Sequence, residues 1–309
     1  MGNRSLFKII IFVSIVYTYN SFIIINNKKA NLSLYDTKKH KQCIISSKNK
    51  KSYCGQDEEI FMDKNDLIKG KKLITISPGG FKGFYSLGIL TFLKENYNTD
   101  EFIFSGASAG AWNSLFMCYK GDPMTFVYNF LDNNMRKAKS ITELQYFFKY
   151  KLLSNYKTED FDLSKLFIGV TTFKKFMPNI NIYTDFEDLE DAINCCMASS
   201  HIPLITGGIT NRYKNMFSFD GGFSDYPYLD KDRLLHISFS MWDELKGINN
   251  NKNFIKRNIM NLKKFSEFFS ISKNNLLELF DNGYQDSKIH KQYFDNLLEQ
   301  KIDDDAPEF

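Results

Sequence analysis

The sequence lacks the residue patterns that bind metals. None of its five cysteines forms a CxxC pair, and its four histidines show no spacing typical of zinc ligands. It also contains no calcium-binding loop of the EF-hand type. We therefore expect a protein that works without a metal or any other cofactor.

The chain carries little excess positive charge outside its first quarter. The formal net charge is only +4, and the excess of lysine lies in the first quarter of the sequence. The remainder has no basic stripe of the kind that binds a phosphate backbone. This distribution argues against nucleic acid as a partner.

The cysteines are also too few and too irregular for a disulfide framework. Their number is odd, and Cys195 and Cys196 are adjacent, which is typical of free thiols. A disulfide between Cys43 and Cys54 is conceivable if the protein enters an oxidising compartment.

The overall composition is that of a packed protein. Hydrophobic residues make up 43% and charged residues 25% of the 309 residues, as is usual for globular proteins. This length accommodates one large α/β domain or two small ones. There is no internal repeat.

Residues 1–25 begin with basic side chains and then become apolar. The apolar part is about long enough to span a bilayer, although polar residues interrupt it. The same pattern fits a signal peptide, but without a clear cleavage site. We expect a signal anchor or signal peptide here, and association with a membrane through this segment. Secretion or organelle targeting after cleavage is the alternative.

Residues 26–70 form a second compositional region. Between residues 26 and 56, eight lysines accompany one acidic residue, Asp36. This predicts a basic, disordered linker. After an anchor it would contact anionic lipid, and after a cleaved signal it would resemble an organelle transit segment.

Residues 71–300 have the pattern of a folded domain, and an acidic tail follows at 301–309. Short apolar runs that predict strands alternate with segments of helical periodicity. We expect strands at 73–77, 101–105, 167–173, 181–184, 216–219 and 235–239, with helices at 84–96, 108–119, 122–137, 142–153, 186–198 and most of 254–300. This alternation predicts a three-layer α/β/α fold with a mainly parallel central sheet.

A small-residue motif with a central serine follows the second of these strands. It reads Gly106-Ala107-Ser108-Ala109-Gly110 and opens a helix. A nucleophile elbow needs this context, because the turn is sharp and the neighbours of the serine must be small. The helix N-terminus would favour negative charge beside the serine. An ordinary turn with a capping serine is the simpler alternative.

Two other glycine-rich segments also end strands. The first, Pro78-Gly79-Gly80-Phe81-Lys82-Gly83, could aim backbone N–H groups at an oxyanion, or serve only as a turn. It lacks the spacing of nucleotide-binding loops. The second, Phe219-Asp220-Gly221-Gly222, would place a carboxylate at the rim of a parallel sheet.

The order of these three segments resembles the patatin-like phospholipase family. The segment Ala198–Pro203 and the segment Leu279–Tyr284 are also similar to that family, so the resemblance covers about 72–300. It implies a Ser108–Asp220 catalytic dyad and an oxyanion loop of Gly79, Gly80, Phe81, Lys82 and Gly83. One departure is Pro78, where the family usually has glycine. Because proline has no N–H, we expect Gly79, Gly80 and Phe81 to be the donors.

The resemblance implies a lipid acyl hydrolase that cleaves ester bonds of phospholipids or glycerides, with Ser108 as nucleophile and Asp220 as base. A free aspartate has a pKa of about 3.9, which is low for this role, so we expect a dry pocket to raise it. Acyl transfer to another alcohol is also possible. The sequence does not indicate the oligomeric state.

Two alternatives compete with this prediction. The first is an α/β-hydrolase esterase with a histidine triad, in which His290 has the appropriate chain order after Ser108 and Asp220. The second is a catalytically inactive lipid-binding protein. Two aromatic segments, 145–153 and 265–269, could form a lid or a rim facing a membrane.

Overall fold

The computed structural model describes residues 42–66, 68–131, 135, 138, 140–174, 177–224, 226–245 and 275–299. The N-terminal segment 1–25, the first part of the basic region, the aromatic segment 265–269 and the tail 301–309 lie outside the described residues. Among the helices that are described, none combines the length and the apolar character needed to cross a bilayer.

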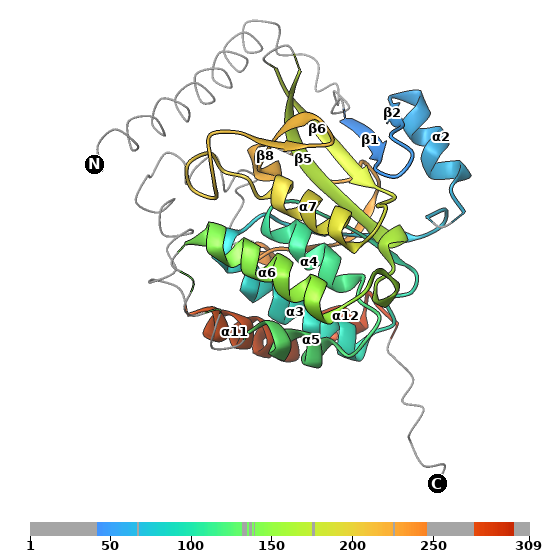
Figure 1. Ribbon diagram of the computed structural model, residues 1–309. Coiled ribbons are helices and arrows are strands. Elements are labelled where there is room, and N and C mark those ends of the chain that lie inside the picture. The colour runs from blue at the N-terminus through green and yellow to red at the C-terminus, as the bar shows by residue number, and fades with distance from the viewer. Residues whose placement is uncertain are drawn as a thin grey trace, which may run out of the picture.

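A central sheet organises the described chain (Figure 1). Nine strands take part, in the order β2-β1-β6-β5-β4-β3-β9, while β8 pairs with both β5 and β7. Their bounds are β1 Gln42–Ser46, β2 Ser52–Cys54, β3 Lys72–Ile76, β4 Phe102–Gly106, β5 Leu166–Lys174, β6 Met177–Thr184, β7 Asn211–Tyr213, β8 Met216–Phe219 and β9 Arg233–Ile237.

The middle of this sheet is parallel, as the alternation of strands and helices predicts. Strands β9, β3, β4 and β5 all run in one direction. Strand β6 turns back against β5, and β1 then runs parallel to β6. Each parallel crossover needs a connecting helix, which accounts for the helical layer.

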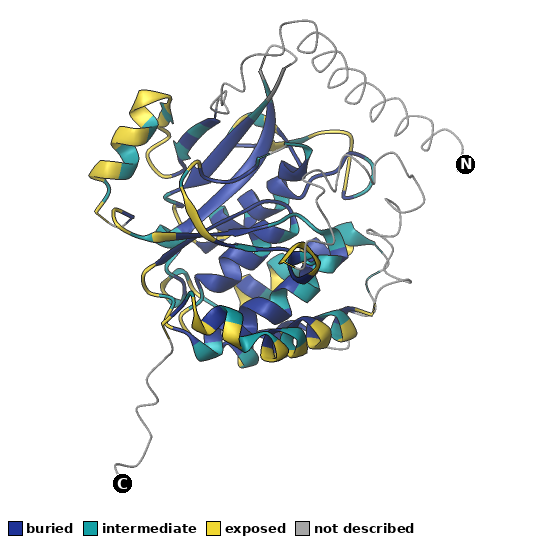
Figure 2. Ribbon diagram, turned by 180° about the vertical axis from the view of Figure 1, so that it is seen from behind, coloured by how far each residue is buried: buried dark blue, intermediate teal, exposed yellow. Residues whose placement is uncertain are grey.

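Most helices cover one face of the sheet (Figure 1). Within the strands, side chains alternate between two cores: Ile74 and Phe104 join the large helical core, whereas Leu73 and Ile103 face the other side. The thin third layer contains α2 (Gln56–Lys64), which is largely exposed in Figure 2. The remaining helices are α3 Gly83–Asn96, α4 Ala109–Met117, α5 Pro123–Phe130, α6 Ile141–Asn155, α7 Leu189–Ser199, α8 Met241–Leu245, α11 Leu276–Ile289 and α12 Lys291–Asp295.

The register of the parallel strands brings the glycine-rich segments together. Ile76 at the end of β3 lies opposite Gly106 at the end of β4. Strand β8 pairs with β5 through Thr171 and Phe219. The segments that follow β3, β4 and β8 therefore leave the sheet in one neighbourhood.

The prediction of a disordered linker across 26–70 is wrong for its described part, which begins at Gln42. Strand β1 lies between β2 and β6 in the sheet, and Ile44 is fully buried in the smaller of the two cores. The high lysine content was misleading because Lys48, Lys50 and Lys51 are exposed in the turn between β1 and β2. The folded domain thus begins before residue 71.

Cys43 and Cys54 are not free thiols in this structure. They face each other across the antiparallel β1–β2 pair and form a disulfide. The other three cysteines, Cys118, Cys195 and Cys196, are buried and unbonded. The disulfide therefore closes the hairpin that contributes β1 to the sheet.

Helices α3 and α11 cross at two glycines. A Cβ atom added to Gly88 would collide with the carbonyl oxygen of Phe280, and one added to Gly283 would collide with that of Tyr85. The segment Leu279–Tyr284, which resembles a helix start in the family, lies in the middle of α11. Its glycine serves the contact with α3.

We expect Gly88→Ala to lower the free energy of unfolding by about 3 kcal/mol, because the added methyl group must separate the two helices. Chemical denaturation of the two proteins measures the difference. Gly208→Ala is the matched control, since its nearest neighbour would be the Thr210 oxygen at 3.9 Å. Equal effects of the two substitutions would contradict the predicted crowding.

Candidate active site

Ser108 lies on a strained turn between β4 and α4. Its backbone has φ 55° and ψ −126°, a conformation that non-glycine residues rarely adopt. A Cβ atom on Gly106 would collide with the Gly110 carbonyl, and one on Gly110 would collide with that of Ile76. The predicted motif therefore forms a sharp strand–turn–helix junction that projects the serine side chain.

Asp220 follows β8 and lies against this turn. Its Oδ2 accepts a hydrogen bond from Ser108 Oγ at 2.6 Å, and its Oδ1 accepts one from the Gly222 N–H at 2.7 Å. The Asp220 N–H donates to the carbonyl of His201 at 2.7 Å. A Cβ on Gly221 would collide with the Gly169 carbonyl, so glycine allows the carboxylate to approach the serine.

The Asp220 carboxyl is desolvated. Both it and Ser108 are only 5% exposed. Burial raises the pKa of Asp220 to about 6, although the hydrogen bonds from Ser108 and Gly222 partly oppose this shift. At neutral pH the group is mainly ionised, yet its pKa is close enough to 7 for reversible proton transfer.

The loop after β3 packs beside the serine. It contains the short 3-10 helix η1 (Gly80–Lys82), and Gly80 has a positive φ of 52°. A Cβ on Gly83 would come within 2.6 Å of the Ala109 Cβ, so the loop and α4 are in close contact. The Lys82 ammonium lies 4.7 Å from the centre of the Phe239 ring.

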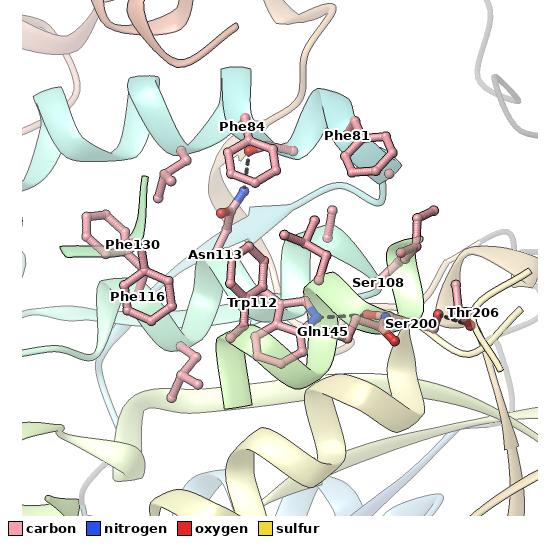
Figure 3. A pocket seen from close by; sticks show the side chains of 18 of the residues that line it. Phe81, Phe84, Ser108, Trp112, Asn113, Phe116, Phe130, Gln145, Ser200 and Thr206 are labelled. Carbon is pink, nitrogen blue, oxygen red and sulfur yellow. Dashed lines mark hydrogen bonds between the residues drawn. The ribbon is translucent and has the colours of Figure 1, made fainter. Parts of the chain in front are cut away.

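A cavity of about 960 Å³, including the open space at its mouth, extends from this point between the helices. Its lining includes Ser108, Trp112 and Phe116, which lie one helical turn apart from the start of α4 and together span about 12 Å at 1.5 Å per residue. Figure 3 shows that aromatic side chains dominate its walls. The described lining contains no lysine, arginine or histidine, and Asp220 is its one acidic residue.

The segment Ala198–Pro203 has a role that the sequence did not reveal. Ser199 Oγ accepts a hydrogen bond from the Ser108 N–H at 2.9 Å and donates to the Gly169 carbonyl at 2.7 Å. Ser200 Oγ accepts from the Trp112 indole at 3.1 Å. The resemblance located this segment, but only the structure shows that it holds the turn at Ser108.

The described histidine side chains form no hydrogen bond with Ser108 or Asp220. His290 stacks on Trp242 with ring centres 4.1 Å apart and contacts the Asp286 carbonyl. His236 pairs with the Thr75 hydroxyl, and burial, reinforced by the charge of Arg233, lowers its pKa to about 4. His40 lies outside the described residues.

The described residues contain no cluster of three histidine, cysteine, aspartate or glutamate side chains that could hold a metal ion. The groups that the described residues bring together at this site are the Ser108 hydroxyl and the Asp220 carboxylate.

Comparison with known proteins gives a consistent family match. Residues 74–230 match the family model described as patatin-like phospholipase. The human patatin-like phospholipase domain-containing protein 4 is 24% identical over 239 residues, which cover 69% of this chain and 94% of that protein.

Two solved structures show a more distant likeness. The ExoU–SpcU complex from the type III secretion system of Pseudomonas aeruginosa aligns at 14% identity and a TM-score of 0.35, covering 75% of this chain. VipD from Legionella pneumophila aligns at 15% identity and a TM-score of 0.31, covering 65%. The chain spans about half the length of each, 53% in both cases.

The raised pKa of Asp220 predicts a pH-dependent cost to stability. The folded state binds this proton more tightly than the unfolded state, so stability falls as pH rises from about 4 to about 6. Above that range the ionised group costs on the order of 3 kcal/mol. We expect Asp220→Asn to raise the melting temperature at about pH 8, and to raise it less at about pH 5. Thermal denaturation at both values measures this, and an equal change at both would contradict it.

Proposed function

The chain belongs to the patatin-like phospholipase family, and from this premise we propose that it cleaves carboxylic ester bonds of phospholipids or glycerides through a Ser108 acyl-enzyme. Family membership supports lipid hydrolase activity. The observation that carries the finer proposal is the 2.6 Å hydrogen bond between the Ser108 hydroxyl and the buried Asp220 carboxylate, at a cavity able to hold an acyl chain.

The reaction proceeds in two steps. Asp220 accepts the hydroxyl proton as Ser108 Oγ attacks the ester carbonyl carbon. The oxyanion is held by backbone N–H groups of Gly79, Gly80 and Phe81. Collapse of the intermediate breaks the carbon–oxygen bond, and the proton passes from Asp220 to the leaving alcohol. Water then attacks the acyl-enzyme, gives a proton to Asp220 that returns to Ser108, and releases a carboxylic acid.

The apolar cavity supports a lipid acyl group as the part of the substrate that is buried. Beyond Ser108, its walls include Trp112, Phe116 and Phe130. Removing a hydrocarbon chain from water into such a cavity is favourable by about 0.8 kcal/mol for each buried CH₂ group. A charged head group has no cationic partner among the described lining residues, so it would remain at the mouth.

Labelling with a fluorophosphonate probe tests the dyad. We expect Ser108→Ala to abolish labelling, and Asp220→Asn to slow it by about 100-fold or more, because the hydroxyl loses its base. The wild-type rate should rise with pH through about 6 as Asp220 ionises. His290→Ala is the control, and we expect it to label like the wild type. Strong dependence on His290, or no labelling of folded wild type, would overturn the proposal.

The outer face of α6 supports a membrane surface as the place of action. Its inner face lines the cavity with Ile141, Leu144 and Phe148, while Tyr146 and Tyr150 on the opposite face are 60% and 71% exposed. Tyrosine favours the boundary between lipid and water, because its ring is apolar and its hydroxyl is polar. The α6 helix would then carry lipid contacts on both faces.

We expect the double substitution Tyr146→Ser and Tyr150→Ser to lower hydrolysis of vesicle-embedded esters several-fold, while hydrolysis of a water-soluble short-chain ester stays unchanged. Comparing the two rates in the full chain separates surface binding from chemistry. Ile289→Ser is the control, because Ile289 is 75% exposed but lies on α11. Equal loss on both substrates would contradict a role at the membrane.

A further inference from the structure

The cavity runs between helices α4 and α6, which point in the same direction. The ring of Trp112 on α4 lies 5.8 Å, centre to centre, from the ring of Phe148 on α6. Further along both chains, the Tyr119 ring just beyond α4 lies 5.1 Å from the Tyr156 ring just beyond α6. Because the contacts advance along the two helices together, the helices are parallel. The space between them therefore leads from Ser108, at the start of α4, toward the ends of both helices.

Helix α5 returns along the same space in the opposite direction. Its Phe126 contacts Phe116 near the end of α4, with ring centres 5.2 Å apart. One turn later on α5, Phe130 contacts Phe148 in the middle of α6 at 5.5 Å. All four rings line the cavity, and Figure 3 shows Phe116 and Phe130 at the end opposite to Ser108. The cavity is thus a chamber that extends away from Ser108 between three helices.

Phe126 closes the far end of this chamber. Its ring lines the cavity, and it also contacts Tyr119 and Tyr156, with ring centres 5.0 and 5.2 Å away. A third ring, that of Phe161, lies at 6.4 Å, and none of these three partners is among the described lining residues. Tyr119 and Phe161 are joined by a β-bridge, so paired backbone supports the rings behind Phe126. The Phe126 ring is therefore an end wall.

The length of the chamber limits the acyl chain that fits inside it. Ser108 and Phe116 are separated by about 12 Å along α4, at 1.5 Å per residue. An extended chain advances roughly 1.2 Å per bond, since a peptide spans about 3.3–3.6 Å for the three backbone bonds of one residue. About ten bonds therefore reach from the ester to the end wall. A longer chain must leave part of its length in water or displace Phe126.

Resting on the proposed function, we propose that Phe126 sets the acyl specificity, so that esters of medium-chain fatty acids, with about ten carbons, are preferred to those with about sixteen. Each CH₂ group that enters the chamber is removed from water, and this gain ends where the chain meets the Phe126 ring. Displacing the ring would force it into Tyr119 and Tyr156, which a close-packed core resists. Phe126 thus determines specificity without touching the reacting atoms.

The test is the dependence of kcat/KM on acyl length, measured with p-nitrophenyl esters at a fixed mole fraction in detergent micelles. We expect wild type to gain about two- to fourfold for each added CH₂ group up to about ten carbons. Between about ten and about sixteen carbons, kcat/KM should fall by about tenfold or more, because the extra groups find no room in the chamber.

Two substitutions change the end wall in opposite directions. Phe126→Ala removes the ring, so the ratio of kcat/KM for the sixteen-carbon ester over the ten-carbon ester should rise about tenfold. Leu152→Phe adds a ring at the same end, because Leu152 lines the cavity one turn before Tyr156, and it should move the optimum to shorter chains. Phe92→Ala is the matched control. Phe92 is buried in the same helical core but is not among the described lining residues, so the wild-type optimum should persist.

Binding to Ser108→Ala provides a readout that does not depend on turnover. Calorimetry should show tighter binding of the saturated fatty acid with about ten carbons than of that with about sixteen, and adding Phe126→Ala should abolish this difference. If wild type hydrolyses none of the esters but the binding difference is present, the hydrolase proposal fails and the assignment of Phe126 stands. A wild-type kcat/KM that keeps rising to the longest ester, or one shared optimum in wild type, Phe126→Ala and Leu152→Phe, would overturn the assignment.

Discussion

The structure depends on a close approach of backbone at the nucleophile turn. Helix α4 begins so near to β3 and β4 that neither Gly106 nor Gly110 could carry a side chain. This packing holds Ser108 in a strained conformation, which a free peptide would leave at a gain on the order of 1–3 kcal/mol. The surrounding parallel strands supply the rigidity that maintains it. The position of this turn also fixes where the cavity, the glycine loop and Asp220 meet.

Desolvation of Asp220 connects stability with chemistry. A carboxylate in water has a low pKa, and burial raises the pKa of Asp220 by making ionisation less favourable, as the proposed role of a base requires. The hydrogen bonds from Ser108 and Gly222 stabilise the ionised carboxylate and so limit the free-energy cost of burying it. The same two bonds aim the carboxylate at the serine, so one arrangement sets both the protonation behaviour and the geometry.

The cavity is built from parts of the chain that lie far apart in sequence. Helix α4 supplies one wall and begins at the serine, while α6 supplies another and exposes its opposite face. Two polar side chains in these walls donate to the protein, Trp112 to Ser200 Oγ and Asn113 to the Gly83 carbonyl. A mainly apolar chamber of this kind is suited to a lipid acyl chain, as the proposed function requires.

Much of this arrangement follows from local sequence. Small residues around Ser108 predict a sharp turn wherever a strand meets a helix, and the period of apolar residues predicts β3, β4, α3 and α4 close to their observed bounds. The resemblance to a family linked Ser108 with Asp220 across 112 positions, a pairing that no local pattern contains. Composition gave the wrong prediction for residues 42–64. The many exposed lysines of the turn indicated a disordered linker, whereas a few buried residues, such as Ile44, place β1 in the sheet.

Tertiary structure alone decided the properties that depend on distance and burial. The sequence determined which groups are available: a hydroxyl, a carboxyl, a glycine loop and many aromatic rings. It could not determine that the carboxyl is dry, that Ser199 supports the nucleophile turn, or that Gln145 faces a cavity. Solvation and hydrogen bonding depend on which side chains from distant segments surround a group, and these neighbours are brought together only when the sheet and its helices assemble.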